Sequence, residues 1–292
     1  MKIFPLTLVC FLVSVLWSAA QVSLELEIDQ EQFLLNESLP VRVRITNRAG
    51  QPLNLGQEKY WITFSISSRD GSLVSPSGER PALGDLSLDP SLSAQRTVDL
   101  MPYFDLNKTG RYTVSASLNI PQWNEEIASK PKPFEIARGT KIWEQEFGVP
   151  AADGSSPEAR RYALVQANYV KRLMLYVRVT DLNDRQVFKV FPAGPLVSFS
   201  RPETHIDGLS NLHVLFQTGA RSFLYEVVSP SGELLRRQTY DYTNTRPVLR
   251  SGEDGVTSVA GGAQRLTAND LPPPTATAAT NNVQTPTPKS KP

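Results

Sequence analysis

The chain has 292 residues, with 30 lysine and arginine residues against 29 aspartate and glutamate residues, so its formal net charge is +1. A charge this close to zero gives no indication of a partner held mainly by electrostatic attraction. No nucleic acid is expected, because nucleic-acid binders gather basic side chains that replace the phosphate counterions. The length is sufficient to bury one large or two ordinary hydrophobic cores without disulfides.

Residues 1–20 have the composition of a cleavable secretory signal. Lys2 is followed by an apolar run and then by small residues ending at Ala20, as expected before a cleavage site. The single cysteine, Cys10, lies inside that run, so a mature chain beginning at Gln21 would contain no thiol and no disulfide. We expect a secreted protein, or one in the periplasm or cell envelope, with no transmembrane segment after cleavage.

Residues 22–137 alternate between apolar and polar side chains. Val22, Leu24 and Leu26 would share one face of a strand, and the same period of two recurs in later runs. Turn-forming clusters separate the runs, which lie at residues 41–46, 61–67, 95–100, 111–118 and 133–137. Six or seven short strands with no helix between them predict an immunoglobulin-like β-sandwich over residues 21–137.

A tyrosine follows a glycine turn at the start of one predicted strand. Tyr112 lies where a tyrosine corner would return its hydroxyl to the preceding loop, so we predict a structural role for it. The segment Tyr103-Phe104-Asp105-Leu106, followed by Gly110-Arg111-Tyr112, resembles secreted bacterial Ig-like accessory domains. The resemblance covers the first domain only and implies a fold without an activity, because such domains serve as spacers, adaptors and companions of enzymes.

A second domain is predicted after a linker. Residues 138–157 form the predicted linker, in which an aromatic and acidic stretch precedes a flexible segment. The domain itself spans residues 158–250. It begins with either a helix or a strand at 159–170 and continues as antiparallel strands joined by tight turns, at residues 173–180, 186–191, 196–200, 212–217, 222–229 and 233–240.

The second domain also contains a faint internal repeat. Residues 173–200 and 212–240 follow a similar order of strands and turns, with Gly194 and Gly232 in matching places, and residues 207–214 resemble the entry to a β-propeller blade. A propeller needs about four or more blades, so we favour a small sheet or sandwich, with an oligomeric or truncated propeller as the alternative. Residues after 250 are rich in Thr, Pro, Ala and Gly, and 251–292 is predicted to be a disordered tail.

No arrangement of residues typical of an enzyme is present. The only two histidines, His205 and His213, flank Asp207, but their spacing matches no zinc motif, so we expect strand packing or a turn hydrogen bond. The sequence has no glycine-flanked serine elbow and no phosphate-binding glycine loop. We therefore predict a chain that is not an enzyme and uses no metal or cofactor.

Carbohydrate recognition is the competing hypothesis. Exposed aromatic rings stack on sugars, so Trp61, Trp123 and Trp143 are candidates, although core packing is the favoured interpretation for each of them. Trp123 lies in a polar stretch and is the one most expected to be exposed, and Trp123 and Trp143 are the candidate binding residues. Glu144 and Glu146 are an acidic pair set among aromatics, and a glycosidase needs two carboxylates roughly 5–10 Å apart. The favoured function is an exported, non-enzymatic binding or assembly module that recognises another protein; the alternative is a carbohydrate-binding module or a minimal glycan-active enzyme.

Overall fold

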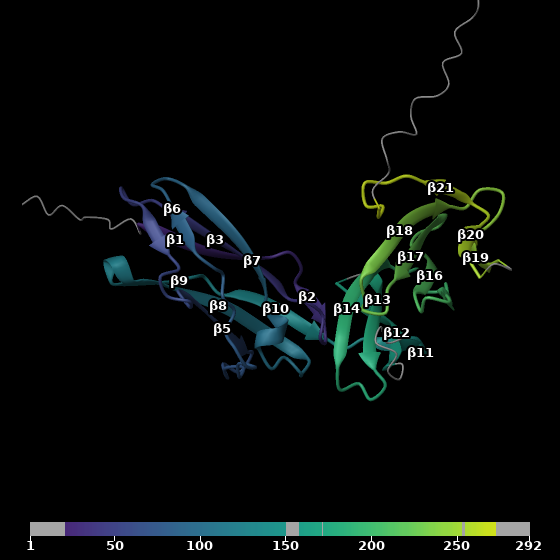
Figure 1. Cartoon of the computed structure of the whole chain (residues 1–292), viewed down its shortest axis with the longest axis horizontal. Coiled ribbons are helices and arrows are strands. Elements are labelled where there is room, and N and C mark those ends of the chain that lie inside the picture. Colours follow the sequence, from purple (N-terminus) through teal and green to yellow (C-terminus); the bar gives the residue numbers. More distant parts are fainter. Residues whose placement is uncertain (1–20, 150–157, 171, 253–254, 273–292) are drawn as a thin grey trace, which may run out of the picture.

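The computed structural model describes residues 21–149, 158–170, 172–252 and 255–272, and over this range the chain is nearly all β. The predicted signal with its cysteine, and residues 273–292 of the predicted tail, lie outside the described residues. Two β-sandwich domains follow one another along the chain, the first coloured purple to teal and the second green to yellow (Figure 1).

Helices contribute little to the described part of the chain. It contains two short 3-10 turns, η1 (Met101–Tyr103) and η2 (Pro121–Trp123). No helix among the described residues is long and apolar enough to cross a membrane.

The first domain is the predicted Ig-like sandwich of two sheets. One sheet has the order β1–β3–β7, from β1 (Val22–Ile28), β3 (Pro40–Asn47) and β7 (Ser93–Asp99). The other has the order β2–β10–β8–β5, from β2 (Gln32–Leu34), β10 (Lys132–Ala137), β8 (Gly110–Ile120) and β5 (Ile62–Ser68), with β9 (Glu125–Ala128) paired to β8. A small sheet joins β4 (Leu53–Leu55) and β6 (Leu86–Leu88). This arrangement corresponds to the A, B and E strands facing the C, F and G strands of an immunoglobulin sandwich.

The alternation in the sequence decides which side chains form the core of this sandwich. Val22, Leu24 and Leu26 on β1 are buried, whereas the residues between them are exposed or half-buried. They belong to the same core as Val114 and Phe134 of the opposite sheet. Full burial of such a side chain contributes about 1.5–3 kcal/mol to stability. A shift of one residue in register would expose all the buried side chains of the strand, so their burial free energies would be lost together.

The second domain packs two antiparallel meanders face to face. The first meander has the order β11–β12–β13–β14, from β11 (Thr140–Val149), β12 (Glu158–Tyr169), β13 (Arg172–Asp181) and β14 (Val187–Pro195). The second has the order β15–β16–β17–β18–β21, from β15 (Glu203–Ile206), β16 (Leu212–Gln217), β17 (Ser222–Val228), β18 (Leu234–Asp241) and β21 (Ala263–Arg265). Tyr162 and Val177 of the first meander share a core with Phe216 of the second. This is the sandwich that the sequence favoured, and the segment left open between helix and strand is strand β12.

The apparent repeat does not correspond to two equivalent blades. Gly194 lies near the end of strand β14, where the second meander approaches: a Cβ atom there would come within 3.4 Å of Leu224 and 3.5 Å of Phe216. Gly232 lies in the turn between β17 and β18, with a φ of +86° that favours glycine. The two glycines are therefore not equivalent. An added Cβ at Gly194 would make ordinary contacts, whereas at Gly232 it would lie 2.3 Å from the Lys189 Cβ atom, so close approach and turn geometry both favour glycine there.

The segment predicted to be a linker contains strand β11, which corrects that expectation up to residue 149; residues 150–157 lie outside the described residues. Trp143 and Phe147 pack against the core of the second domain, and Phe147 stacks on Tyr162 with ring centroids 4.1 Å apart. Trp143 and Phe147 are four residues apart on an edge strand, so both side chains point inward from it. Only residues 138 and 139 separate β10 from β11.

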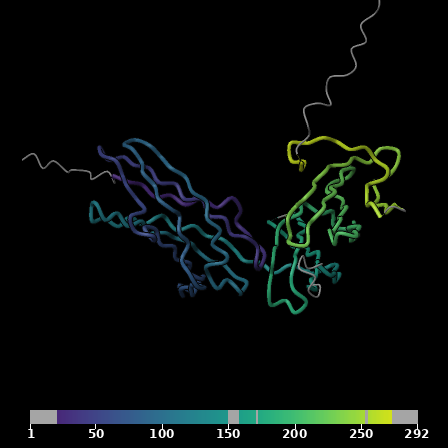
Figure 2. The backbone as a smooth tube through the Cα atoms, viewed as in Figure 1, coloured from purple at the N-terminus to yellow at the C-terminus, as the bar shows by residue number. Residues whose placement is uncertain are grey.

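A small apolar cluster joins the two domains beside this short connection. Leu34 of β2 packs with Val165 and Tyr176 of the second domain. Gly139 lies so close to the same cluster that an added Cβ would be 2.2 Å from the Val165 Cγ1 atom. Figure 2 shows the backbone passing from the first sandwich to the second at this point.

The predicted tail is ordered further than its composition suggested. β19 (Val248–Ser251) pairs with β20 (Thr257–Ala260), and β21 adds to the second meander. Leu271 exchanges two backbone hydrogen bonds with Arg237, at 2.7 and 2.9 Å. The Asp270 carboxylate accepts hydrogen bonds from the amide and hydroxyl of Thr267, which closes the preceding turn. Backbone pairing, a side-chain turn and the packing of Val259 against the cluster around Phe223 and Tyr225 order this segment.

A chain that ends at residue 250 should be less stable than one that ends at residue 272. The shorter chain loses β20, β21 and the backbone bonds of Leu271, so we expect its second domain to lose at least about 2 kcal/mol of unfolding free energy. The longer chain should stay within about 0.5 kcal/mol of the full chain. Urea denaturation monitored by hydrogen exchange of the β17 and β18 amides measures this, and equal stability of the two truncations would contradict it.

Candidate functional site

The two candidate binding tryptophans do not form a common platform. Trp123, at the end of η2, is half-buried and packs against the core of the first domain. Trp143, on β11, is half-buried and packs against the core of the second. Trp61 is buried, and its indole N–H donates to the Gly84 carbonyl at 2.8 Å. Each tryptophan thus has a packing partner within its own domain.

The acidic pair on β11 is neutralised by neighbouring bases. Glu146 forms an ion pair with the Arg161 Nη2 atom at 2.8 Å. Glu144 contacts Lys141 at 2.5 Å and the Arg161 Nε atom at 3.8 Å. These side chains give a charged surface to an edge strand, and their geometry favours that role over paired catalytic carboxylates.

The histidines lie opposite each other on β15 and β16, and His213 belongs to a buried row of hydrogen bonds. Its Nε2 atom is 3.1 Å from Asp207 Oδ2 and its Nδ1 atom is 2.7 Å from the Tyr225 hydroxyl. Burial lowers the pKa of His213, which favours a neutral ring that donates to Asp207 and accepts from Tyr225. Within the described ranges, no group of three or more potential metal ligands gathers. The row is enclosed by the fold and accounts for both ring nitrogens.

A second buried polar contact lies on the other face of the same sheet. Glu226 on β17 is fully buried, and its Oε1 atom is 2.6 Å from the Arg237 Nη2 atom. Its Oε2 atom has no hydrogen-bond partner among the residues that the structure describes. Burial raises the pKa of Glu226 to about 7, although Arg237 acts in the opposite direction. This carboxyl group lies between the two sheets and, like the histidine row, is enclosed by the fold.

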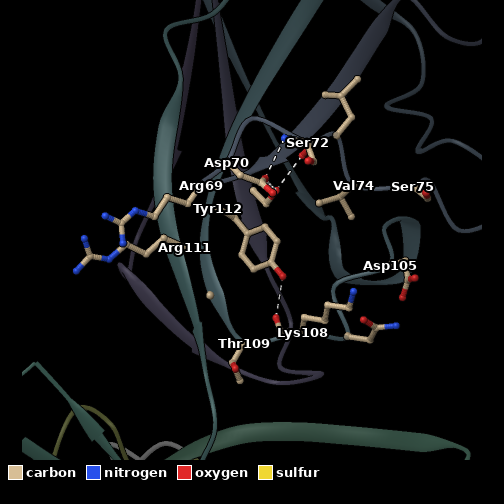
Figure 3. Close-up of a pocket in the computed structure, with 14 residues that line it drawn as sticks. Arg69, Asp70, Ser72, Val74, Ser75, Asp105, Lys108, Thr109, Arg111 and Tyr112 are labelled. Atoms are coloured by element: carbon tan, nitrogen blue, oxygen red, sulfur yellow. Dashed lines mark hydrogen bonds between the residues drawn. The ribbon is translucent and has the colours of Figure 1, made fainter.

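An open hollow lies at one end of the first domain, where β5 ends and β8 begins (Figure 3). Its volume is about 940 Å³, and it is lined by residues from 68–75 and 105–112. Tyr112 stands within it, and its hydroxyl donates to the Lys108 carbonyl at 2.8 Å. This is the tyrosine-corner contact that the sequence predicted, and it fixes the loop that forms one wall of the hollow.

Two acidic residues, Asp70 and Asp105, line the hollow, and Asp70 is held by its own turn. The Asp70 carboxylate accepts hydrogen bonds from the Ser68 hydroxyl at 2.5 Å and from the Ser72 amide at 3.1 Å. The hydrogen bond from Ser68 and those from Ser72 lower the pKa of Asp70. Its charge is therefore engaged locally and is not paired with the bases around it.

Those bases have no partner of their own among the described carboxylates. Arg69, Lys108 and Arg111 line the hollow without forming an ion pair in the described part of the chain. Figure 3 shows the Arg69 and Arg111 side chains extending in the same direction, away from the Tyr112 ring. These three bases outnumber the two carboxylates of the hollow, Asp70 and Asp105, by one, and Glu135 lies opposite Arg111 in the sheet, so the local field is weakly positive.

A groove of about 400 Å³ lies on the other side of the loop, against strand β5. Its wall is largely apolar, formed by Leu73, Val74, Pro76, Pro81, Tyr103 and Phe104. Leu73 borders both the hollow and the groove and is 75% exposed.

The groove also has a basic residue on its edge. Arg80 lines it, and the adjacent carboxylate, Glu79, is already bound by Lys59 and by the Tyr60 hydroxyl. Arg80 forms no ion pair in the described ranges, so this groove combines an apolar wall with an uncompensated cation.

Sequence reasoning identified the strand and the turn here but not the site. The run at 61–67 and the turn after it were both predicted, yet the hollow arises from the loop before Tyr112 folding against them. The sequence did contain one signal: residues 62–68 have no charged side chain. Strands at the edge of a sheet usually carry charges that discourage pairing with another chain.

Comparisons with known proteins assign no family. No family model matches the sequence, and no curated protein matches it. Among solved structures, an alkylpurine DNA glycosylase, AlkC of Pseudomonas fluorescens, bound to DNA with an abasic site analog, matches 40% of this chain with 17% identity and a TM-score of 0.27. This chain spans 31% of the length of the glycosylase chain. The sporulation control protein Spo0M of Bacillus subtilis matches 59% of this chain and 91% of its own, with 9% identity and a TM-score of 0.26. These likenesses carry no functional argument.

Replacing Tyr112 by phenylalanine should destabilise the first domain by about 1 kcal/mol, because the Lys108 carbonyl loses its hydroxyl donor while the ring packing is retained. Tyr103→Phe is a matched control, since Tyr103 packs on the same core and its hydroxyl forms no hydrogen bond in the described chain. Chemical denaturation of both variants tests the prediction. Equal stabilities would show that the corner bond contributes nothing.

Proposed function

We propose that this chain is an exported, non-enzymatic module that binds another protein through the loop end of its Ig-like domain. One observation carries the proposal: Leu73 is exposed between the hollow and the groove. The bases that line these two features without forming an ion pair in the described residues are Arg69, Arg80, Lys108 and Arg111. An exposed apolar side chain beside a groove gains from losing its water on binding. Bases around it steer and orient an acidic partner.

The polar groups elsewhere support a binding role over catalysis. Glu144 and Glu146 are ion-paired on an edge strand. His213 has both ring nitrogens engaged, and Glu226 is enclosed between sheets. A general acid or base must reach the proton it transfers, and these groups are already committed to the fold.

The start of the fold is compatible with processing of an exported precursor. Strand β1 begins at Val22, whose side chain is fully buried, and the Gln21 carbonyl accepts a hydrogen bond from the Arg48 amide at 2.6 Å. Cleavage after Ala20 would leave these contacts intact. The signal-like composition of residues 1–20 then accounts for delivery to the periplasm, the envelope or the medium.

The protein recovered from its native host should begin at Gln21. Mass spectrometry of the intact protein from envelope and medium fractions measures this. An Ala20→Arg variant, which removes the small residue before the cleavage point, should retain the leader and accumulate as precursor. Recovery of wild-type protein from the cytosol with residues 1–20 still attached would contradict export.

A partner captured from the native envelope by the chain beginning at residue 21 should depend on Leu73. We expect Leu73→Asp to reduce capture at least about tenfold, since it removes apolar contact and places a negative charge near the partner's acids. Quantitative affinity purification measures this. Leu92→Asp is the matched control, because Leu92 is 52% exposed elsewhere on the same domain.

A glycan array examined in parallel separates the competing hypothesis. Glycan binding that is lost in Trp123→Ala and unaffected by Leu73→Asp would replace protein recognition with carbohydrate recognition. A partner retained equally by both leucine variants would place the binding surface elsewhere on the molecule.

A further inference from the structure

Strand β5 has a paired side and an open side. On the paired side it bonds only to β8, and the Asn119 amide donates to the Trp61 carbonyl at 2.8 Å. On the open side, the Val74 amide of the following loop donates to the Ile66 carbonyl at 2.8 Å. Backbone groups alternate along a strand, so the odd-numbered residues of β5 bond to β8 and the even-numbered ones point outward.

The following loop covers only one end of this open side. Leu73 pairs with Ser67, but the chain then turns away, and the Ser75 carbonyl accepts instead from the Asp105 amide at 3.0 Å. The remaining outward groups have no partner in the described residues. They are the amides and carbonyls of Ile62 and Phe64, which are 2% and 6% exposed and line the groove, and the amide of Ile66, which is fully buried.

The same edge lacks the usual protection against strand pairing. Natural edge strands carry charges, bulges or prolines that discourage a second chain from adding to them. Among the described edge strands of seven residues or more, β1, β7, β11 and β14 each contain at least one charged residue, whereas β5 contains none. The pairing of β5 with β8 shows no bulge.

The groove lies along this open edge. Residues 62–66 form one of its walls, and the apolar side chains of the loop form the other. An incoming strand would thus find backbone donors and acceptors on one side and an apolar surface on the other. These are the two components of recognition by strand addition, in which backbone bonds supply affinity and side-chain pockets supply specificity.

We infer that an extended segment of another protein adds to β5 as a further strand and places alternate apolar side chains against the wall that contains Leu73. This inference rests on the proposed function and names the class of partner. Arg80 lines the groove without an ion-pair partner in the described residues, and three further bases lie beyond Leu73, namely Arg69, Lys108 and Arg111. The incoming segment should therefore contain at least one carboxylate.

A random twelve-residue peptide library displayed on phage, selected against the chain from residue 21 to its end, tests this inference. Enriched peptides should alternate apolar and polar residues and contain Asp or Glu. One enriched peptide is then synthesised, and exchange of the Ile62 and Phe64 amides should slow at least about tenfold in the complex. Leu73→Asp and Arg80→Glu should each weaken its binding at least about tenfold.

Two control variants and the site of protection decide the outcome. Leu92→Asp and Arg96→Glu change exposed residues outside the groove and should leave peptide affinity unchanged. A library that yields no binder, or a peptide that protects β7 amides instead of β5 amides, overturns the inference. Capture of an envelope protein with β5 unprotected would overturn strand addition alone, whereas glycan binding without protein capture would overturn the proposed function as well.

Discussion

Backbone pairing along β8 is the constraint on which the first domain and its candidate site depend. This eleven-residue strand bonds to β5 on one side and to β10 and β9 on the other. A buried central strand must satisfy its amides and carbonyls on both sides. The sheet then ends at β5, whose outward groups are left to the loop that follows. Tyr112 lies near the start of the same strand, and its hydroxyl holds the preceding loop in place. The core, the hollow and the open edge therefore all depend on β8.

The second domain follows a different principle, with polar groups enclosed and individually bonded. His213 bonds to Tyr225 on one face of its sheet, and the neighbouring Glu226 contacts Arg237 on the other. The two groups affect stability in opposite directions. A lowered histidine pKa removes stability as the pH falls below about 6.5, the unfolded value. A carboxyl pKa raised to about 7 removes stability as the pH rises from the unfolded value toward 7. The two effects oppose each other at mildly acidic pH, above the unfolded glutamate value of 4.5 and below the unfolded histidine value of 6.5.

The period-two pattern was sufficient to predict the β-sandwich architecture, because each strand buries one face. Val22 to Leu26 and the corner at Tyr112 illustrate how local spacing determines both face and fold. Strand β11 was assigned to a linker because only Trp143 and Phe147 mark its inner face, while Glu144 and Glu146 between them gave the segment the composition of an exposed connection. The strands after residue 250 were missed because β20 is held by pairing with β19 and β21 by pairing with β18, which composition does not record. The segment after them is held by the pairing of Leu271 with Arg237 and by the turn that Asp270 closes. The candidate site was missed because a sequence does not reveal which strand is outermost.

The contrast between two edges of the molecule shows why β5 is the more informative one. At β11, Lys141, Glu144 and Glu146 and a bulge after Lys141 make strand addition costly. At β5, small hydroxyl residues such as Thr63 and Ser65 face solvent, and the register is regular. An uncharged, regular edge is a hazard in a protein that has nothing to bind there, since it also templates self-association. This edge lies beside an apolar groove, and the other long edge strands of the described chain carry charges. The simplest explanation is that a strand of a partner protein pairs with β5.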